Sequence, residues 1–189
     1  DIKSKIAKRA LISLGWKFPD TFPSGGPFIC ILYPHTTMSD TLIAFLFGTY
    51  VRQSFFIPVK ESFDIPGISF LLRKLNLLTI TRDRAGYEKI RNEMENTGAQ
   101  PCIAIEGTRK LSNGIKPGFF NIAKETNKKI LLFGCDWQRK TFHMFDPFEP
   151  KETAEDTILV LKELLEDLRP MGLYPENESP IVLSRSDKK

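Results

Sequence analysis

The chain has 189 residues, a formal net charge of +4 and a hydrophobic fraction of 41%, with fifteen phenylalanines. This length and composition indicate one folded domain with a substantial core, and they exclude a disordered or low-complexity chain. The small basic excess suits acidic partners such as phosphates, anionic lipid or nucleic acid, and it does not choose among them.

Residues 1–22 form the first predicted unit, a basic amphipathic segment. At helical spacing, one stripe carries the apolar residues Ile2, Ile6, Ala10 and Leu14 beside the cations Lys3, Lys5, Lys8 and Arg9. Such a helix can lie on an anionic membrane, although a helix with an apolar stripe more often packs on a core, so both interpretations stay open. No apolar run approaches the roughly 20 residues that span a bilayer. A chain that begins at Asp1 leaves a preceding anchor or signal open.

Short apolar runs alternate with segments of helical periodicity through the middle of the chain. We expect strands at residues 28–33, 54–59, 76–80, 102–105 and 130–135. We expect helices between them at residues 40–51, 66–75, 86–97 and 117–127. Strands that are apolar on both faces are typical of a covered, mostly parallel sheet. The pattern predicts an α/β fold: a single domain, a mostly parallel sheet flanked by helices, and an active site at the carboxyl ends of the strands.

The main domain is expected to span residues 23–170. Its last helix begins at Thr153, where Asp156 completes a capping pattern, and one apolar stripe continues until Pro170 ends it. Residues 171–189 are rich in proline, serine and charge, and we interpret them as a tail or a late edge strand.

The cysteines Cys30, Cys102 and Cys135 are odd in number and lie in apolar runs. We expect buried, reduced thiols in a reducing compartment, because a disulfide framework needs paired cysteines. This favours a cytoplasmic location, with peripheral membrane contact if residues 1–22 bind lipid.

His35 and Asp40 are the first candidates for chemistry. The histidine follows the first predicted strand, and the aspartate lies in the first turn of the next helix. A carboxylate beside an imidazole fixes its tautomer and stabilises the imidazolium, which leaves the other nitrogen free as a base. The alternative is a surface histidine with an aspartate that only favours the start of the helix.

The stretch Glu106, Gly107, Thr108 and Arg109 follows the fourth predicted strand. Glycine permits a sharp turn and close approach of a ligand, and an arginine past a strand end can bind a phosphate with two parallel hydrogen bonds. An ordinary turn with a solvated ion pair is the competing interpretation.

Two further cations, Lys60 and Arg82, follow the second and third predicted strands. Each alone fits a solvated surface charge. Because parallel strands end at one edge of a sheet, all these side chains are expected to lie together.

Other chemistry has no sequence support. The chain lacks a serine-hydrolase elbow, a P-loop and a dinucleotide-binding turn. Two separated histidines and scattered cysteines give no metal-ligand spacing, so we expect no metal site, and His143 is interpreted as a packed or loop histidine. The aromatic residues lie in apolar runs and are not interleaved with cations, so we expect no nucleic-acid partner.

The order of these motifs resembles the glycerolipid acyltransferase family. The matching stretches are PHTTMSD, VKES with TITRDR, AIEGTR, and KPGFFNIAKETNKKILLFG, between about residues 28 and 140. The resemblance implies that His35 is the general base and Asp40 its partner, that Arg82 is the second-motif arginine, and that Lys60 is a basic position after the second strand. It further implies that Glu106, Gly107, Thr108 and Arg109 bind the acceptor, with arginine on its phosphate.

Two positions depart from the family pattern. Ile105 and Leu132 stand where the family usually has proline. Neither change removes a titrating or phosphate-binding group, so both bear on the acceptor more than on the reaction.

The resemblance implies an O-acyltransferase of phospholipid biosynthesis. It would transfer a fatty acyl group directly from acyl-CoA or acyl-carrier protein to a hydroxyl of a glycerol phosphate or lysophospholipid, as in 1-acylglycerol-3-phosphate acylation. The thioester is a co-substrate and no resident cofactor is implied. The resemblance also favours peripheral membrane binding through residues 1–18. A thioesterase and a non-catalytic lipid- or phosphate-binding protein are the alternatives.

Overall fold

The computed structural model describes residues 1–61, 76–81 and 83–184. The predicted helix at 66–75 and the candidate Arg82 lie outside the described residues. Within them the chain is one α/β domain, which confirms the predicted fold class.

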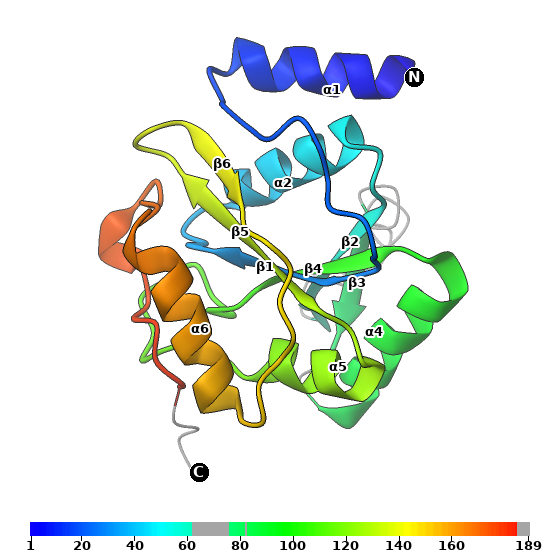
Figure 1. Ribbon diagram of the computed structural model, residues 1–189, viewed down its shortest axis with the longest axis vertical. Coiled ribbons are helices and arrows are strands. Elements are labelled where there is room, and N and C mark those ends of the chain that lie inside the picture. Colours follow the sequence, from blue (N-terminus) through cyan, green and yellow to red (C-terminus); the bar gives the residue numbers. More distant parts are fainter. Residues whose placement is uncertain (62–75, 82, 185–189) are drawn as a thin grey trace.

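One sheet of six strands forms the centre of the described structure, in the order β3-β2-β4-β1-β5-β6 (Figure 1). The strands are β1 (Ile29–Tyr33), β2 (Phe55–Lys60), β3 (Leu77–Ile80), β4 (Gln100–Ala104), β5 (Ile130–Asp136) and β6 (Thr141–Met144). Neighbours pair in parallel except β5 and β6, which pair antiparallel. The five parallel strands therefore end at one edge, as predicted.

Five α-helices among the described residues cover the sheet. They are α1 (Ile2–Ser13), α2 (Met38–Tyr50), α4 (Arg84–Thr97), α5 (Gly118–Thr126) and α6 (Ala154–Glu166). Figure 1 shows α1 and α2 on one side of the sheet and α4, α5 and α6 on the other. The predicted capping pattern is confirmed at α6, where the Thr153 side chain accepts from the Asp156 N–H at 3.1 Å.

β1 explains why the predicted strands are apolar without alternation. Ile29, Ile31 and Tyr33 pack in the core beneath α4, α5 and α6, while Cys30 and Leu32 pack in the core beneath α1 and α2. Every residue of β1 is buried, since helices cover both faces of the sheet. Burying an aliphatic side chain stabilises the fold by roughly 1.5–3 kcal/mol, so this central strand contributes to both cores.

The ladder between β2 and β4 is short. It includes only the pairs Phe55–Gln100 and Phe56–Pro101, and from residue 57 onward β2 pairs with β3. Pro101 and Pro58 have no N–H to donate to a ladder, which favours separation of the two strands here. The later residues of β2 and β4 line a cavity instead.

α1 does not pack its predicted apolar stripe on the core, which was one of the two open interpretations. Its buried residues are Ser4, Ala7 and Leu11, next to α2. The predicted apolar stripe points outward, and Ile6 and Leu14 are 61% and 50% exposed. The helix ends at Ser13, within the predicted basic amphipathic segment of residues 1–22.

Two regions were not predicted in this form. β6 lies in a hairpin with β5, and its short sequence, TFHM, gives a weak apolar signal. Residues 171–184, which we call the C-terminal segment, contain a 3-10 helix at Pro175–Asn177 and one isolated bridge, Ile115–Leu183. The segment packs against the core under α4, α5 and α6 through Ile181 and Leu183.

The three cysteines are free and buried, as predicted. Among the described helices, none has the length and apolarity needed to cross a membrane.

Candidate active site

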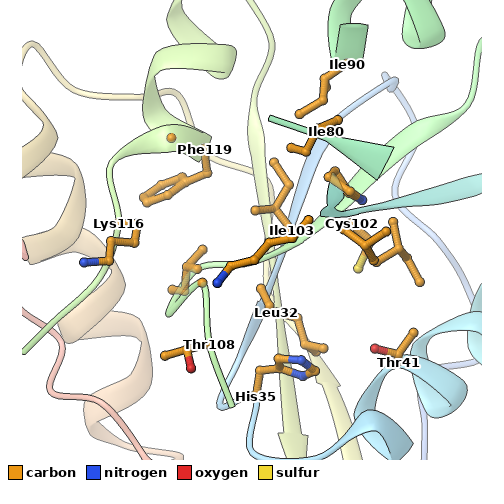
Figure 2. Close-up of a pocket in the computed structure, with 18 of the residues that line it drawn as sticks. Leu32, His35, Thr41, Ile80, Ile90, Cys102, Ile103, Thr108, Lys116 and Phe119 are labelled. Atoms are coloured by element: carbon orange, nitrogen blue, oxygen red, sulfur yellow. The ribbon is translucent and has the colours of Figure 1, made fainter. Parts of the chain in front are cut away.

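A cavity of about 470 Å³ opens at the carboxyl edge of the sheet, between β2 and β4. Figure 2 shows His35 at one end of it, between Thr41 and Thr108, with Ile80 and Ile90 at the other end. Most lining side chains are apolar, and they include Ile57, Leu77, Tyr87, Ile103, Phe119 and Ile122. The cavity is therefore suited to an elongated apolar group whose reactive end reaches the histidine.

His35 and Asp40 meet as the sequence predicts. Nδ1 of His35 lies 3.2 Å from Oδ2 of Asp40, within ion-pair distance. The two atoms do not meet hydrogen-bond geometry, and Nδ1 has no hydrogen-bond partner in the described part of the chain. Histidine–carboxylate contacts in reaction sites often align only when substrate is bound.

Asp40 is fully buried and is held by several donors. Its Oδ2 accepts the N–H groups of Thr36 and Thr37, both at 2.9 Å, and the bond from Thr37 is one half of the capping box of α2. Its Oδ1 accepts the indole N–H of Trp137, and the Cys135 thiol lies 3.8 Å away. Helix capping and the histidine contact therefore use the same carboxylate oxygen.

Glu106 contacts the loop of residues 34–37, which carries His35 and is called the histidine loop below, and it does not line the cavity. It is fully buried, with Oε2 accepting the His35 N–H and Oε1 accepting the Ser179 N–H at 2.8 Å. Burial raises the pKa of Glu106, and the N–H groups of Ser179 and His35 oppose that rise. In this geometry Glu106 joins the histidine loop to the C-terminal segment.

The remaining predicted residues after β4 line the cavity near His35. Gly107 adopts a positive φ of 66°, a conformation that glycine tolerates, and so turns the chain after Glu106. Thr108 is half-buried, and Arg109 is an exposed cation.

Two lysines also line the cavity. Lys60, predicted from the sequence, is exposed at the end of β2. Lys116 was not selected from the sequence; it is half-buried and donates from Nζ to Ser184 Oγ at 2.7 Å. Together with Arg109 they add positive charge to the lining of the cavity, which suits an anionic group.

Trp137 and Ser179 were also missed by sequence reasoning. Trp137 directly follows β5, so the rule that selected the other strand-end residues would have selected it. Ser179 lies in the C-terminal segment and reaches the site only through the fold, so no local signal marked it.

His143 lies outside this cavity, on β6. Its Nε2 is 3.9 Å from Asp136 Oδ2 and has no hydrogen-bond partner among the described residues. Burial lowers the pKa of His143, and Arg139 adds to this while Asp136 opposes it. No group of three or more histidine, cysteine, aspartate or glutamate residues in the described ranges could hold a metal ion.

A model of the acyltransferase family matches residues 16–136, more than half of the chain. The matched span contains β1 to β5, the His35–Asp40 pair and the Glu106–Arg109 stretch. No curated protein and no solved structure gives a significant match.

Proposed function

Because the chain belongs to the acyltransferase family, we propose that it transfers a fatty acyl group from an acyl-CoA or acyl-carrier-protein thioester to a hydroxyl of a glycerol phosphate or lysophospholipid. The observation that carries the proposal is the His35–Asp40 pair at the end of a largely apolar cavity with cations beside it. The apolar length accommodates a fatty chain, and the cations suit a phosphate.

In the proposed reaction, His35 takes the proton of the acceptor hydroxyl as its oxygen attacks the thioester carbonyl carbon. The carbon–sulfur bond then breaks, and the leaving thiolate takes the proton from the imidazolium. Asp40 stabilises the imidazolium from 3.2 Å. Transfer is direct, so no acyl-enzyme intermediate forms.

Arg109 is proposed to hold the acceptor phosphate, with Lys60 as a second cation and Arg82 carried as a further candidate from the sequence. Fixing the acceptor beside His35 makes the reaction effectively intramolecular. Gly107 and Thr108 would form the wall next to the acceptor, while Glu106 supports the loop from beneath.

A lipid acceptor also implies that the protein binds to a membrane surface during the reaction. We propose peripheral contact through α1, whose outward residues are apolar and basic. A role in phospholipid synthesis and a cytoplasmic location are parts of the same proposal.

The test incubates purified protein with acyl-CoA or acyl-carrier protein and three acceptors: glycerol-3-phosphate, lysophosphatidic acid and lysophosphatidylcholine. Free thiol carrier and lipid products are followed together by mass spectrometry. We expect an acylated lipid, and a loss of about 10²–10⁴-fold in turnover for His35→Ala. His143→Ala, which changes the only other histidine, should retain turnover.

Variants of Arg109 test the acceptor site. Arg109→Ala should raise KM for phosphorylated acceptors, and Arg109→Lys should restore it only in part, since lysine lacks the two-pronged geometry. If Arg109→Ala and wild type have equal KM values for phosphorylated acceptors, Arg109 does not bind the acceptor phosphate.

Other outcomes identify the alternatives. Thiol release matched only by free fatty acid, at a rate independent of acceptor, would indicate a thioesterase. Lipid binding without turnover, unchanged in His35→Ala, would indicate a binding protein.

A further inference from the structure

Asp40 is a buried carboxylate whose two oxygens are held by different parts of the fold. Oδ2 receives the amides of Thr36 and Thr37 and lies beside His35. Oδ1 lies toward β5, where it receives the indole N–H of Trp137. The Cys135 thiol at 3.8 Å is the other donor on this oxygen, and a thiol donates weakly.

Trp137 is itself fixed by three contacts. Its backbone N–H donates to the Met171 carbonyl at 2.8 Å. Its ring meets the Trp16 ring edge-on at 5.0 Å between centroids, and Lys140 Nζ lies 4.4 Å from its centroid on a ring face. A donor held this firmly loses little freedom when it binds a carboxylate, so the geometry favours one orientation of Asp40.

We propose that Trp137 is a positioning residue for the reaction: its indole N–H holds Oδ1 of Asp40 so that Oδ2 stays directed at His35. This inference rests on the proposed function, because it assigns Trp137 a role only through the His35–Asp40 pair. Trp137 does not line the described cavity, so it acts without touching substrate.

Two effects follow from the hydrogen bond. It resists rotation of the carboxylate, since rotation would leave a buried oxygen without a strong donor. It also offsets part of the negative charge on Asp40, so the carboxylate stabilises the His35 imidazolium less strongly. Loss of the fixed orientation should slow the chemical step and leave substrate binding intact, whereas the change in charge on Asp40 should move the pH dependence of the rate.

The kinetic test compares Trp137→Phe with Tyr50→Phe. Each variant keeps an aromatic ring and loses a side-chain donor to a carboxylate, which is Asp40 in the first and the exposed Asp20 in the second. We expect Trp137→Phe to lower kcat about tenfold or more, as for a lost hydrogen bond to a charged group, with KM for both substrates nearly unchanged. The acid limb of its pH profile should move to higher pH, because the less neutralised carboxylate favours the imidazolium. Tyr50→Phe should match wild type in both measures.

The outcomes separate this inference from the proposed function. If wild type turns over and His35→Ala does not, yet Trp137→Phe keeps the kcat and pH profile of wild type, the role of Trp137 is wrong and acyl transfer stands. If His35→Ala is as active as wild type, the proposed function fails and the inference fails with it.

A second measurement covers the case in which Trp137→Phe does not fold. The chain has two tryptophans, so the two indole N–H resonances in a nitrogen–proton NMR spectrum are assigned with Trp16→Phe. The Trp137 resonance should move upfield in Asp40→Asn, and the Trp16 resonance should stay in place. A Trp137 resonance that does not move would overturn the hydrogen bond and the inference together.

Discussion

Glu106 illustrates how one buried side chain can organise a reaction site without lining it. Each of its carboxylate oxygens accepts one backbone N–H, from His35 and from Ser179. Ionised carboxylates accept at both oxygens, whereas an amide accepts at one and donates at the other. The charge of Glu106 therefore matches two donors that arrive from distant parts of the chain.

We expect Glu106→Gln to lower both stability and activity, although glutamine and glutamate have nearly the same size. The glutamine NH₂ would oppose one of the two backbone N–H groups, leaving a buried donor unpaired at a cost of about 1–3 kcal/mol. The variant should lose several degrees in Tm and at least tenfold in kcat. Thermal unfolding and the acyl-transfer assay measure the two effects. A Glu106→Gln protein with the Tm and kcat of wild type would mean that this carboxyl is protonated in the native state.

His143 gives a pH dependence whose sign follows from its surroundings. Burial lowers its pKa in the folded protein below the ordinary value of 6.5. The unfolded chain therefore binds a proton more strongly than the folded one as pH falls through 6.5, so folding stability decreases in that window. The Asp136 carboxylate, 3.9 Å from Nε2, opposes this effect but does not outweigh burial.

The test measures Tm between about pH 7.5 and pH 5.5. His143→Gln cannot titrate, so its Tm should fall less over this range than that of wild type. His35→Gln measures the share of the other histidine. Parallel curves for wild type and His143→Gln would show that His143 does not contribute.

At the scale of elements, the C-terminal segment connects two loops at the site and the end of β1. Tyr174 N–H donates to Thr36 Oγ1 at 3.2 Å, beside His35. Ser179 binds Glu106, and its carbonyl accepts the Tyr33 hydroxyl at 3.0 Å. The segment thus holds the histidine loop directly at Thr36 and, through Glu106, at His35.

Gly172 provides a local test of this segment. A Cβ at this position would lie 2.6 Å from Thr36 Oγ1 and 2.7 Å from its Cγ2. Gly172→Ala should therefore displace Thr36 and His35, lowering kcat several-fold with a smaller effect on Tm. Leu173→Ala, at an adjacent residue that is 41% exposed, is the matched control. Equal kcat values for the two variants would show that the histidine loop does not depend on this contact.

Elements with a local signal were predicted well. The five parallel strands follow from apolar runs, and the His35–Asp40 contact follows from a strand end and a helix cap that are close in sequence. The C-terminal segment could not be predicted, because its contacts join residues such as Ser179 and Glu106, far apart in the chain. The stripe of α1 was identified but its direction stayed open, since only packing against α2 selects the face that is buried.

At the scale of the whole molecule, charge and apolar surface meet on α1. This helix has α2 on one side and leaves the opposite side outward (Figure 1). Ile2 and Ile6 are 75% and 61% exposed, and the helix carries the cations Lys3, Lys5, Lys8 and Arg9. Apolar residues next to cations match the interface of an anionic bilayer.

Vesicle binding tests whether α1 contacts lipid. Wild type should sediment with vesicles of phosphatidylcholine and phosphatidylglycerol, more weakly with phosphatidylcholine alone, and less as salt rises, because attraction to anionic lipid is screened. Ile6→Asp places a carboxylate on the apolar face that would enter the bilayer, and it should reduce vesicle binding at least tenfold. Its kcat with a soluble short-chain acceptor should stay near that of wild type. Leu159→Asp introduces the same charge at a residue of α6 that is 55% exposed, on the other side of the sheet, and should bind like wild type. If Ile6→Asp and Leu159→Asp bind the vesicles equally well, α1 does not contact the lipid, and its exposed isoleucines need another explanation.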